Sequence, residues 1–598
     1  MAEFFRACAQ GILPACALFA LACGEVRDAD PDAGGGEVVD AAGDGGEGGD
    51  GGDENGAPAA SAEHSTISGE DGAIADGEDI AEITIELLDD SGAPVAGVTP
   101  EFEASGDGNA YEPCSATGDD GIATCGMTST EGGEKTLQLT APVERTGETI
   151  DFLLVCEEDG APFGGGDGSE DDPYRLCSPE QLNRVGDGDD FLEDAFIVAR
   201  DLDMSGQNDF NVIGVGPGFS GRFDGGGRVI SNLSIIRPDG SYLALIGHAT
   251  EEAEIAHVRL EDIDFRGDRN SFAGGLVGFN QGTIVGAYVS GEIENDRAEL
   301  GGLVGDSRGS IADSRAEVDV TGQSFNVGGL VGFNTGPISN SHATGDVVSE
   351  GDSIAGLAGF NDAEISDSSA SGNVTCVEED CNQIGGLVGN NGGVIRDSHA
   401  TGDVEAVGGA SGDFGSSYRS FGGLVGRHAG EIVRSYATGN VLTADANGVG
   451  GLSGTSGVIS DSFATGEVTS EGEGVGGLVG AQFEEIRNSY ATGAVTGGDK
   501  VGGLVGEQSA LLRDSYSTGA VSGEGQQVGG LVGESTDAVV DSFWDEETSI
   551  GESDGGTPLS TDDFGDEESF PSSWNFAEIW TIGEAPDGET RPILQWQE

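Results

Sequence analysis

A short string of glycine and apolar residues recurs along much of the chain. It reads VGGLVG or a close variant at 300–305, 327–332, 384–389, 421–426, 501–506 and 528–533. Aligned on the motif leucine, most successive repeats lie 26 to 31 residues apart. A unit of this size cannot bury its apolar face alone, so it must stack on copies of itself. The period therefore predicts a solenoid.

A second motif follows each leucine by about ten residues, as in ISNSHATGDV at 338–347 and IRNSYATGAV at 486–495. Each unit is predicted to hold two or three strands of about four residues. Stacked strands about 4.8 Å apart form ladders of like residues. We expect the glycines to form tight corners with positive φ. The fold class is all-β: a parallel β-helix, which the pattern favours over leucine-rich-repeat or propeller architectures.

The string GLVG, as at 275–278 and 302–305, resembles the GLUG motif of bacterial surface and adhesin-like proteins. The resemblance covers about 161–598 and concerns architecture, because the motif carries no chemistry. We assign 161–545 to the β-helix, with an N-terminal cap and the first coils in 161–240. Residues 546–598 are predicted to cap the last coil. They and the preceding turn hold all four tryptophans, which are Trp544, Trp574, Trp580 and Trp596.

Residues 64–160 show alternating apolar residues and turn signals, which are typical of a β-sandwich. The strings ADGEDIAEIT at 75–84 and TGDDGIAT at 117–124 resemble the bacterial Ig-like group 1 domain of intimin- and invasin-type proteins. In that family the module is a spacer or display unit.

The first 23 residues read as a bacterial export signal, with Arg6 and a short apolar run. The string Ala-Leu-Ala-Cys at 20–23 resembles a lipobox, which would make Cys23 the lipidated residue of an envelope lipoprotein. An ordinary secretory signal cut nearby is the alternative. Residues 24–63, acidic and rich in glycine, are predicted to form a disordered tether.

Six cysteines remain beyond the signal and fall into three local pairs. The even number and local spacing predict disulfides in an oxidising compartment. The predicted pairs are Cys114 with Cys125, Cys156 with Cys177, and Cys376 with Cys381.

The strongly negative charge of the chain limits the kinds of partner that it can bind. Acidic residues outnumber basic ones by 109 to 24, for a net charge of −85. This excludes nucleic acid, which needs a basic footprint, and leaves the lipid anchor as the only expected membrane contact. We expect a monomer in the cell envelope, at the outer membrane or cell surface.

No catalytic or metal-binding motif stands out. The aspartates before serine (Asp367, Asp397, Asp461, Asp514 and Asp541) recur with the repeat, so we interpret them as a polar ladder. His342 and His399 occupy a position that holds aromatic residues in sister repeats, and no H-E-x-x-H string exists. Calcium is the one cofactor that any segment suggests, through the acidic loop at 164–172.

The longest coil, from Leu387 to Leu424, holds about ten extra residues within 404–420. Extra residues in a solenoid coil protrude as a loop and often bind ligands. Phe414, Tyr418 and Arg419 are residue types enriched at binding hot spots. We therefore expect a non-enzymatic surface protein that binds a cell-surface or glycan ligand. The alternatives are a carbohydrate-active β-helix enzyme (a polysaccharide lyase or glycosidase) and a passive structural component.

Overall fold

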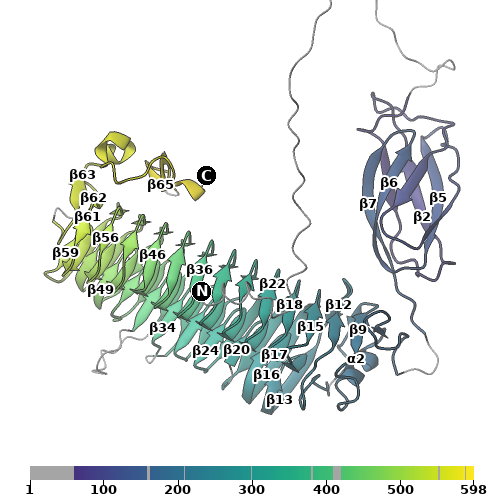
Figure 1. Cartoon of the computed structure of the whole chain (residues 1–598), viewed down its shortest axis with the longest axis horizontal. Helices are drawn as coiled ribbons and strands as arrows, with labels where there is room; N and C mark the ends of the chain where they lie inside the picture. Colours follow the sequence, from purple (N-terminus) through teal and green to yellow (C-terminus); the bar gives the residue numbers. More distant parts are fainter. Residues whose placement is uncertain are drawn as a thin grey trace, which may run out of the picture. The chain divides into compact units, whose positions relative to one another are not determined.

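The computed structural model describes residues 59–597 apart from 158–161, 208, 298, 379–380, 408–418, 550–551 and 586–587. Cys23, the signal and residues 24–58 of the predicted tether lie outside the described residues. The last residues of the predicted tether belong to the sandwich instead, because the Ser61 amide donates to the Leu88 carbonyl at 2.7 Å and Arg145 donates to the Ala62 carbonyl at 2.7 Å. The described chain forms an N-terminal β-sandwich and a long parallel β-helix (Figure 1). The predicted all-β class is confirmed.

The sandwich consists of two antiparallel sheets, ordered β1-β2-β5-β4 and β3-β6-β7. Their strands are β1 (Thr66–Gly69), β2 (Ala81–Glu86), β3 (Glu101–Ala104), β4 (Asn109–Glu112), β5 (Ile122–Ser129), β6 (Gly133–Ala141) and β7 (Arg145–Phe152). Alternation places Ile83 and Ile85 of β2 in the core, where neither is exposed. A disulfide joins Cys114 to Cys125 on β5.

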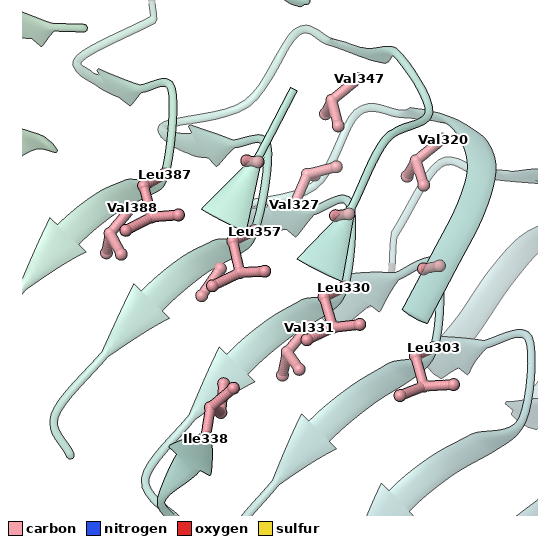
Figure 2. Packing of buried hydrophobic residues seen from close by; sticks show 14 of the residues in the cluster. Leu303, Val320, Val327, Leu330, Val331, Ile338, Val347, Leu357, Leu387 and Val388 are labelled. Carbon is pink, nitrogen blue, oxygen red and sulfur yellow. The ribbon is translucent and has the colours of Figure 1, made fainter. Parts of the chain in front are cut away.

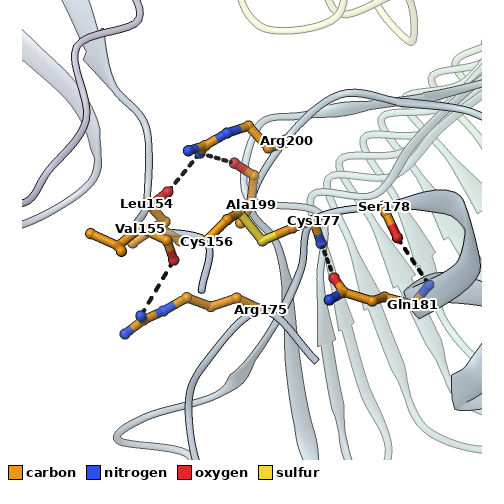
Figure 3. The surroundings of a disulfide bond; sticks show 9 residues. All are labelled: Leu154, Val155, Cys156, Arg175, Cys177, Ser178, Gln181, Ala199 and Arg200. Carbon is orange, nitrogen blue, oxygen red and sulfur yellow. Dashed lines mark hydrogen bonds between the residues drawn. A yellow bond between two sulfur atoms is a disulfide. The ribbon is translucent and has the colours of Figure 1, made fainter. Parts of the chain in front are cut away.

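A short helix stands near the start of the β-helix. Helix α2 (Pro179–Val185) begins after Ser178, whose side chain accepts a hydrogen bond from the Gln181 amide. The Gln181 side chain in turn accepts from the Cys177 amide at 2.7 Å (Figure 3). The strands before and after it are β8 (Tyr174–Leu176) and β9 (Ala195–Val198).

One coil illustrates all the later ones. It contains β24 (Asn326–Gly328), β25 (Val331–Asn334), β26 (Ile338–Ser339), β27 (His342–Ala343) and β28 (Val347–Ser349), and the next coil begins with β29 (Ser353–Ala355). Each strand pairs in parallel with its counterpart one coil away. The coils thus share three long sheets.

The number of strands per coil was predicted wrongly, because there are five short strands rather than two or three. The second motif is interrupted between β26 and β27 by Asn340, which has φ of 44°. A left-handed residue ends one strand and redirects the chain before the next. The same position in other coils has φ between 46° and 65°; it is occupied by His257, Gly286, Asp313, Asp367, Asp397, Arg434, Asp461, Asn488, Asp514 and Asp541.

The glycines of the repeat motif have a different role from the one predicted. They do not adopt positive φ; instead they allow backbones to touch. A Cβ at Gly329 would lie 2.1 Å from the Gly356 carbonyl oxygen of the next coil, and one at Gly332 would lie 2.5 Å from the Leu300 amide nitrogen. Between these glycines, Leu330 and Val331 are fully buried, and the motif leucines form a row through the core (Figure 2).

We expect Gly332→Ala to destabilise the protein by about 1–3 kcal/mol, because the added methyl group must push two coil backbones apart. Denaturant unfolding would measure this. Gly206→Ala is the matched control, since nothing lies within 4 Å of a Cβ there. Equal stability of the two variants would contradict the close-approach explanation.

Two buried polar ladders run beside the apolar core. In the serine ladder, the hydroxyl of Ser435 accepts from the Ser398 amide at 3.2 Å and donates to the Val433 carbonyl at 2.9 Å. In the asparagine ladder, Asn334 donates to Asn361, which donates to Asn391, each at 2.7 Å. Buried polar groups are tolerated when they are hydrogen-bonded in this way.

The C-terminal residues fold back along the flank of the coils (Figure 1). They include β63 (Thr557–Leu559), the antiparallel pair β64 (Trp580–Glu584) and β65 (Thr590–Leu594), and short 3-10 turns. Trp544, on β62 (Phe543–Asp545), belongs to the main core, whereas Trp574 and Trp580 form a second core. We call residues 552–597 the C-terminal flank segment.

The second core contains a column of stacked rings contributed by successive coils. Tyr436, Phe463, Tyr490 and Tyr516 stack with centroid distances of 4.8, 4.9 and 5.0 Å. The indole nitrogen of Trp596 donates to the Asp461 carbonyl at 3.0 Å, several coils before the last one. The flank segment therefore covers the side of the solenoid as well as its final coil.

Candidate binding surface

One edge of the β-helix carries the irregular connections of the middle coils. It lies between the equivalent strands β28 and β29, β33 (Val374–Cys376) and β34 (Gln383–Gly385), and β38 (Val404–Ala406) and β39 (Ser420–Gly422). Going from coil to coil, the connection lengthens from 350–352 to 377–382 and then to 407–419. The flanking strands stay in register. We call this edge the insertion edge.

The two longer connections start and end on neighbouring strands, which the sequence alone did not reveal. Cys376 pairs with Ala406 across β33 and β38, and Gln383 pairs with Ser420 across β34 and β39. Both insertions therefore leave and re-enter the solenoid at equivalent positions of adjacent coils. The sequence signal for this was the longer spacing of two successive motif leucines, 30 residues from Leu357 to Leu387 and 37 from Leu387 to Leu424.

Polar contacts fix the base of the shorter insertion. A disulfide joins Cys376 to Cys381 across it, and both cysteines are buried. The Asn382 amide donates to Asp352 at 2.7 Å, and the Ser353 hydroxyl donates to Gln383 at 3.1 Å. These contacts anchor the insertion to the preceding coil.

Apolar side chains gather along the same edge. Phe325 is 73% exposed, Val407 62%, Leu442 48% and Val377 43%. Val377 and Val407 lie in the connections named above. Phe325 lies in the equivalent connection one coil earlier, between β23 (Arg315–Gly322) and β24. Leu442 lies on β43 (Val441–Thr443), beside Glu405 of β38. Clustered exposed apolar residues mark interaction sites more often than scattered ones do.

The predicted ligand-facing residues can be placed only in part. Phe414 and Tyr418 lie outside the described residues. Arg419 is half-buried and directly precedes β39. The described ends of this connection, Val407 and Arg419, lie at the insertion edge.

The histidines show packing roles. His399 stacks on Tyr436 with ring centroids 4.7 Å apart, and His342 bonds to Ser369 at 2.9 Å. Burial lowers the pKa of both imidazoles. Their column continues into the stacked rings of the second core, as expected for residues that substitute for an aromatic side chain.

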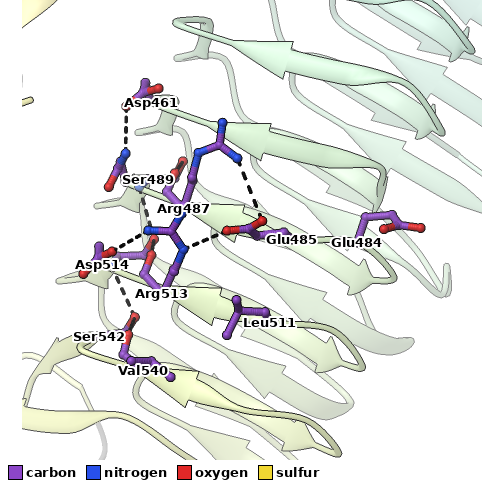
Figure 4. Close-up of polar contacts among 12 residues, drawn as sticks. Asp461, Glu484, Glu485, Arg487, Ser489, Leu511, Arg513, Asp514, Val540 and Ser542 are labelled. Atoms are coloured by element: carbon purple, nitrogen blue, oxygen red, sulfur yellow. Dashed lines mark hydrogen bonds and ion pairs between the residues drawn. The ribbon is translucent and has the colours of Figure 1, made fainter. Parts of the chain in front are cut away.

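The recurrent aspartates occupy the left-handed turn described above, and some are ion-paired. Arg434 binds Asp397 through two nitrogens, at 2.6 and 2.5 Å. Arg513 bridges Glu485 and Asp514, at 2.7 and 2.9 Å (Figure 4). Aspartate and asparagine tolerate left-handed φ better than most residues, which explains the recurrence without catalysis.

A pair of carboxylates that breaks the repeat was missed from the sequence. Asp306 stands where neighbouring coils have Phe279 and Phe333. Burial raises the pKa of Asp306 and of Glu299, and the charge of Asp306 raises the pKa of Glu299 further. Each carboxylate is already engaged, Asp306 with Arg308 at 3.2 Å and Glu299 with Asn326 at 2.7 Å.

Lys500 is held by carboxylates from three coils. Its ammonium lies 2.8 Å from Glu507, 3.2 Å from Glu534 and 3.9 Å from Glu473. The hydrogen bond to Glu507 raises the pKa of Lys500. The amine stays protonated at neutral pH, so it is unsuited to the general-base role that a lyase requires.

The acidic loop at 164–172 is organised by its own contacts. Asp167 accepts from the Ser169 amide at 3.0 Å, and Asp172 pairs with Arg175 at 3.2 Å. Among the described residues, no group of three or more histidine, cysteine, aspartate or glutamate side chains is arranged to hold a metal ion. In the same part of the chain, none of the helices has the length and hydropathy needed to span a membrane.

Comparison with known families agrees with both parts of the fold. Residues 65–153 match the bacterial Ig-like domain (group 1), and residues 323–348, 380–405 and 471–496 match the GLUG motif. The chain contains both modules. The resemblances to the Ig-like group 1 domain and to the GLUG motif are therefore confirmed.

Among curated proteins, halomucin of Haloquadratum walsbyi (strain DSM 16790 / HBSQ001) is 31% identical over 143 residues. The match covers 22% of this chain and only 2% of halomucin. The chain therefore spans a very small part of this relative.

Three solved structures show partial similarity, each with a low TM-score. InvD of Yersinia pseudotuberculosis is 16% identical, covering 18% of this chain and 33% of its own, with a TM-score of 0.16. Invasin, a bacterial integrin-binding protein, is 24% identical over 19% and 22%, with a TM-score of 0.15. A putative immunoglobulin A1 protease from Bacteroides ovatus is 17% identical over 73% and 97%, with a TM-score of 0.24.

Proposed function

We propose that this chain is a non-enzymatic cell-surface protein that uses its β-helix for adhesion or cell-contact binding. The insertion edge is the contact surface. One observation carries the assignment: two insertions leave adjacent coils at the same edge, where Phe325, Val377 and Val407 are exposed. The Ig-like group 1 domain and the GLUG motif, both typical of surface proteins, support the location.

The same proposal includes the remaining predicted parts. Cys23 carries the lipid that anchors the chain in the cell envelope, and residues 24–58 act as the tether. The Ig-like domain is a spacer, and the β-helix is displayed as a monomer. The ligand is a glycan or a cell-surface protein.

The enzymatic alternative has weaker support. The charge of Asp306 raises the pKa of Glu299, as in an acid pair, yet both carboxylates are bound to other side chains. Asp306 is only 4% exposed, which leaves little room for a sugar ring. The passive structural alternative predicts no saturable ligand.

Binding assays with the full chain test the proposal. We expect saturable binding to one member of a panel of glycans and purified surface proteins. Because apolar residues at the centre of a contact carry much of its energy, Phe325→Ser with Val407→Ser should weaken binding at least about tenfold. Val215→Ser, which replaces a 48% exposed valine elsewhere, is the control.

Three outcomes would contradict the proposal. Equal binding by the edge variant and the control would exclude the insertion edge. Absence of binding to every ligand in the panel would favour the passive component. Turnover of a polysaccharide that is lost in Glu299→Gln would favour the enzyme.

A further inference from the structure

Two asparagines of the chain lie in an Asn-X-Ser/Thr sequon, the acceptor sequence for N-linked glycosylation. They are Asn232, in Asn-Leu-Ser, and Asn373, in Asn-Val-Thr. Both belong to the β-helix, and both side chains are exposed. The two side-chain amides differ, however, in the hydrogen bonds that they make. This difference indicates which of them is free to carry a glycan.

Asn373 directly precedes β33 and belongs to an exposed polar ladder. The Asn373 backbone amide donates to the Asp346 carboxylate of the preceding coil at 2.8 Å. The Asn373 Oδ1 in turn accepts from the Asp403 backbone amide of the next coil at 3.1 Å. The side-chain oxygen is therefore fixed towards the next coil. Among the described residues, none accepts a hydrogen bond from Nδ2, so this nitrogen is left to solvent.

The strand that follows Asn373 also places the sequon hydroxyl on the outer surface. Side chains alternate between the two faces of a sheet along a strand, and Val374, the middle residue of the sequon, is fully buried. Asn373 and Thr375 therefore lie on the same outer face of the β-helix. Thr375 is half-buried and stands beside Val348 of the preceding coil and Glu405 of the next. The acceptor amide and the hydroxyl are thus presented together.

The amide of Asn232 is already engaged. Its Nδ2 donates to the Asp203 carboxylate at 2.9 Å and to the Ser231 hydroxyl at 3.4 Å. Attaching a sugar to this nitrogen would remove one of its two hydrogens, and one of these bonds would be lost. The backbone of Asn232 is also left-handed, with φ of 57°. Asn232 therefore serves as a comparison for Asn373 within the same chain.

We propose that Asn373 is an N-glycosylation site and that Asn232 remains unmodified. The donor is an oligosaccharide linked through phosphate to a lipid carrier, and a transferase catalyses the step. Asn373 Nδ2 attacks the anomeric carbon of the first sugar, and a C–N bond forms. The bond from this carbon to the phosphate oxygen breaks, the lipid phosphate leaves with the bonding electrons, and Nδ2 gives up one proton.

The modification is compatible with the ladder. Its product is still an amide, so the Asn373 Oδ1 still accepts the hydrogen bond from the Asp403 amide. The glycan itself extends from the exposed surface into solvent. The proposal requires export of the chain but does not depend on ligand binding at the insertion edge.

Glycopeptide mass spectrometry of the full chain, isolated from the cells that produce it naturally, tests the proposal. The peptide with Asn373 should carry a glycan on this asparagine, and the peptide with Asn232 should carry none. Thr375→Val should abolish the modification, because it removes the hydroxyl. The fold should tolerate this change, since Val348 occupies the equivalent position of the preceding coil. Thr375→Ser keeps the hydroxyl and is the matched control, which should remain glycosylated.

Asn440 allows a test in the opposite direction. It occupies the same ladder, where its Oδ1 accepts from the Glu467 amide at 3.0 Å, and it is exposed. It lacks only the hydroxyl, because the chain reads Asn-Val-Leu at this point. Leu442→Thr completes the sequon, and threonine already occurs at the equivalent position of the next coil as Thr469. This variant should gain a second glycan, on Asn440.

Four results would overturn the proposal. Asn373 could be unmodified in the chain from its natural source. A glycan that persists in Thr375→Val would be attached independently of the sequon. Glycosylation of Asn232 to the same extent as Asn373 would show that the hydrogen bonds of Nδ2 do not select the site. Failure of Leu442→Thr to gain a glycan would show that the exposed ladder position is not an acceptor.

Discussion

Replacing Trp580 by alanine is expected to destabilise the C-terminal coils by about 3–5 kcal/mol, the usual cost of removing a large buried aromatic side chain. Trp580 is fully buried and stacks on Trp574 at 4.7 Å. Its ring also lies 6.0 Å from Tyr516 and 6.3 Å from Tyr490. Removing it leaves a cavity between the flank segment and the stacked rings.

The effect should be local, because each coil of a solenoid contacts only its neighbours. Hydrogen exchange should rise in residues 436–545 and remain unchanged in residues 245–330. Trp596→Ala is the control; Trp596 is only partly buried and packs at the margin, on Tyr436 and Phe463. Unchanged protection in the C-terminal coils of Trp580→Ala would show that the flank segment does not stabilise them.

Acid is expected to weaken the β-helix through His428. This residue takes an asparagine-ladder position and is buried. Its Nδ1 lies 3.1 Å from the Asn391 amide nitrogen, and its Nε2 lies 3.4 Å from the Val458 carbonyl. The neutral ring, protonated on Nε2, satisfies both contacts. A second proton, on Nδ1, would point at the Asn391 amide nitrogen, which is itself a hydrogen-bond donor.

Burial lowers the pKa of His428 from 6.5 to about 4. Between pH 6.5 and about 4, His428 is therefore protonated in the unfolded chain and neutral in the folded chain. Stability is complete above pH 6.5 and falls as the pH drops towards 4, by about 3 kcal/mol in all.

His428→Asn should remove this dependence, because asparagine occupies the same position in the preceding coil as Asn391. The measurement is the difference in unfolding free energy between the two proteins at several pH values from 7 to 4.5. His342 and His399 are present in both and cancel. Parallel pH profiles would contradict the assigned role of His428.

The repeat alone determined most of the architecture. Because each coil places equivalent residues directly above one another, a fixed spacing in the sequence becomes a fixed position in space. The spacing of the motif therefore suffices to align Leu330, Leu357 and Leu387 as one buried row. The three disulfides join cysteines close in sequence, so their pairing also followed from the chain itself.

The backbone conformation of individual residues was harder to predict from the sequence. The glycines of the motif look like turn residues, but they are needed where two backbones approach, as Gly332 does Leu300. The left-handed corners fall instead on residues such as Asp397 and Asn340. In the sequence, a glycine required by a positive φ looks the same as one required by a close backbone in the next coil.

Only the tertiary structure decided what the non-repeating segments contact. The repeat does not predict which coil Trp596 contacts, and in the structure its indole binds the Asp461 carbonyl. It does not predict the position of Phe163 either, which packs on Tyr174 at the N-terminal end of the core. The strands that flank the two insertions of the insertion edge were likewise separate in sequence and are neighbours through strand pairing. Periodicity fixes the contacts between equivalent residues, whereas a segment outside the period is placed by the shape and chemistry of the surface on which it packs.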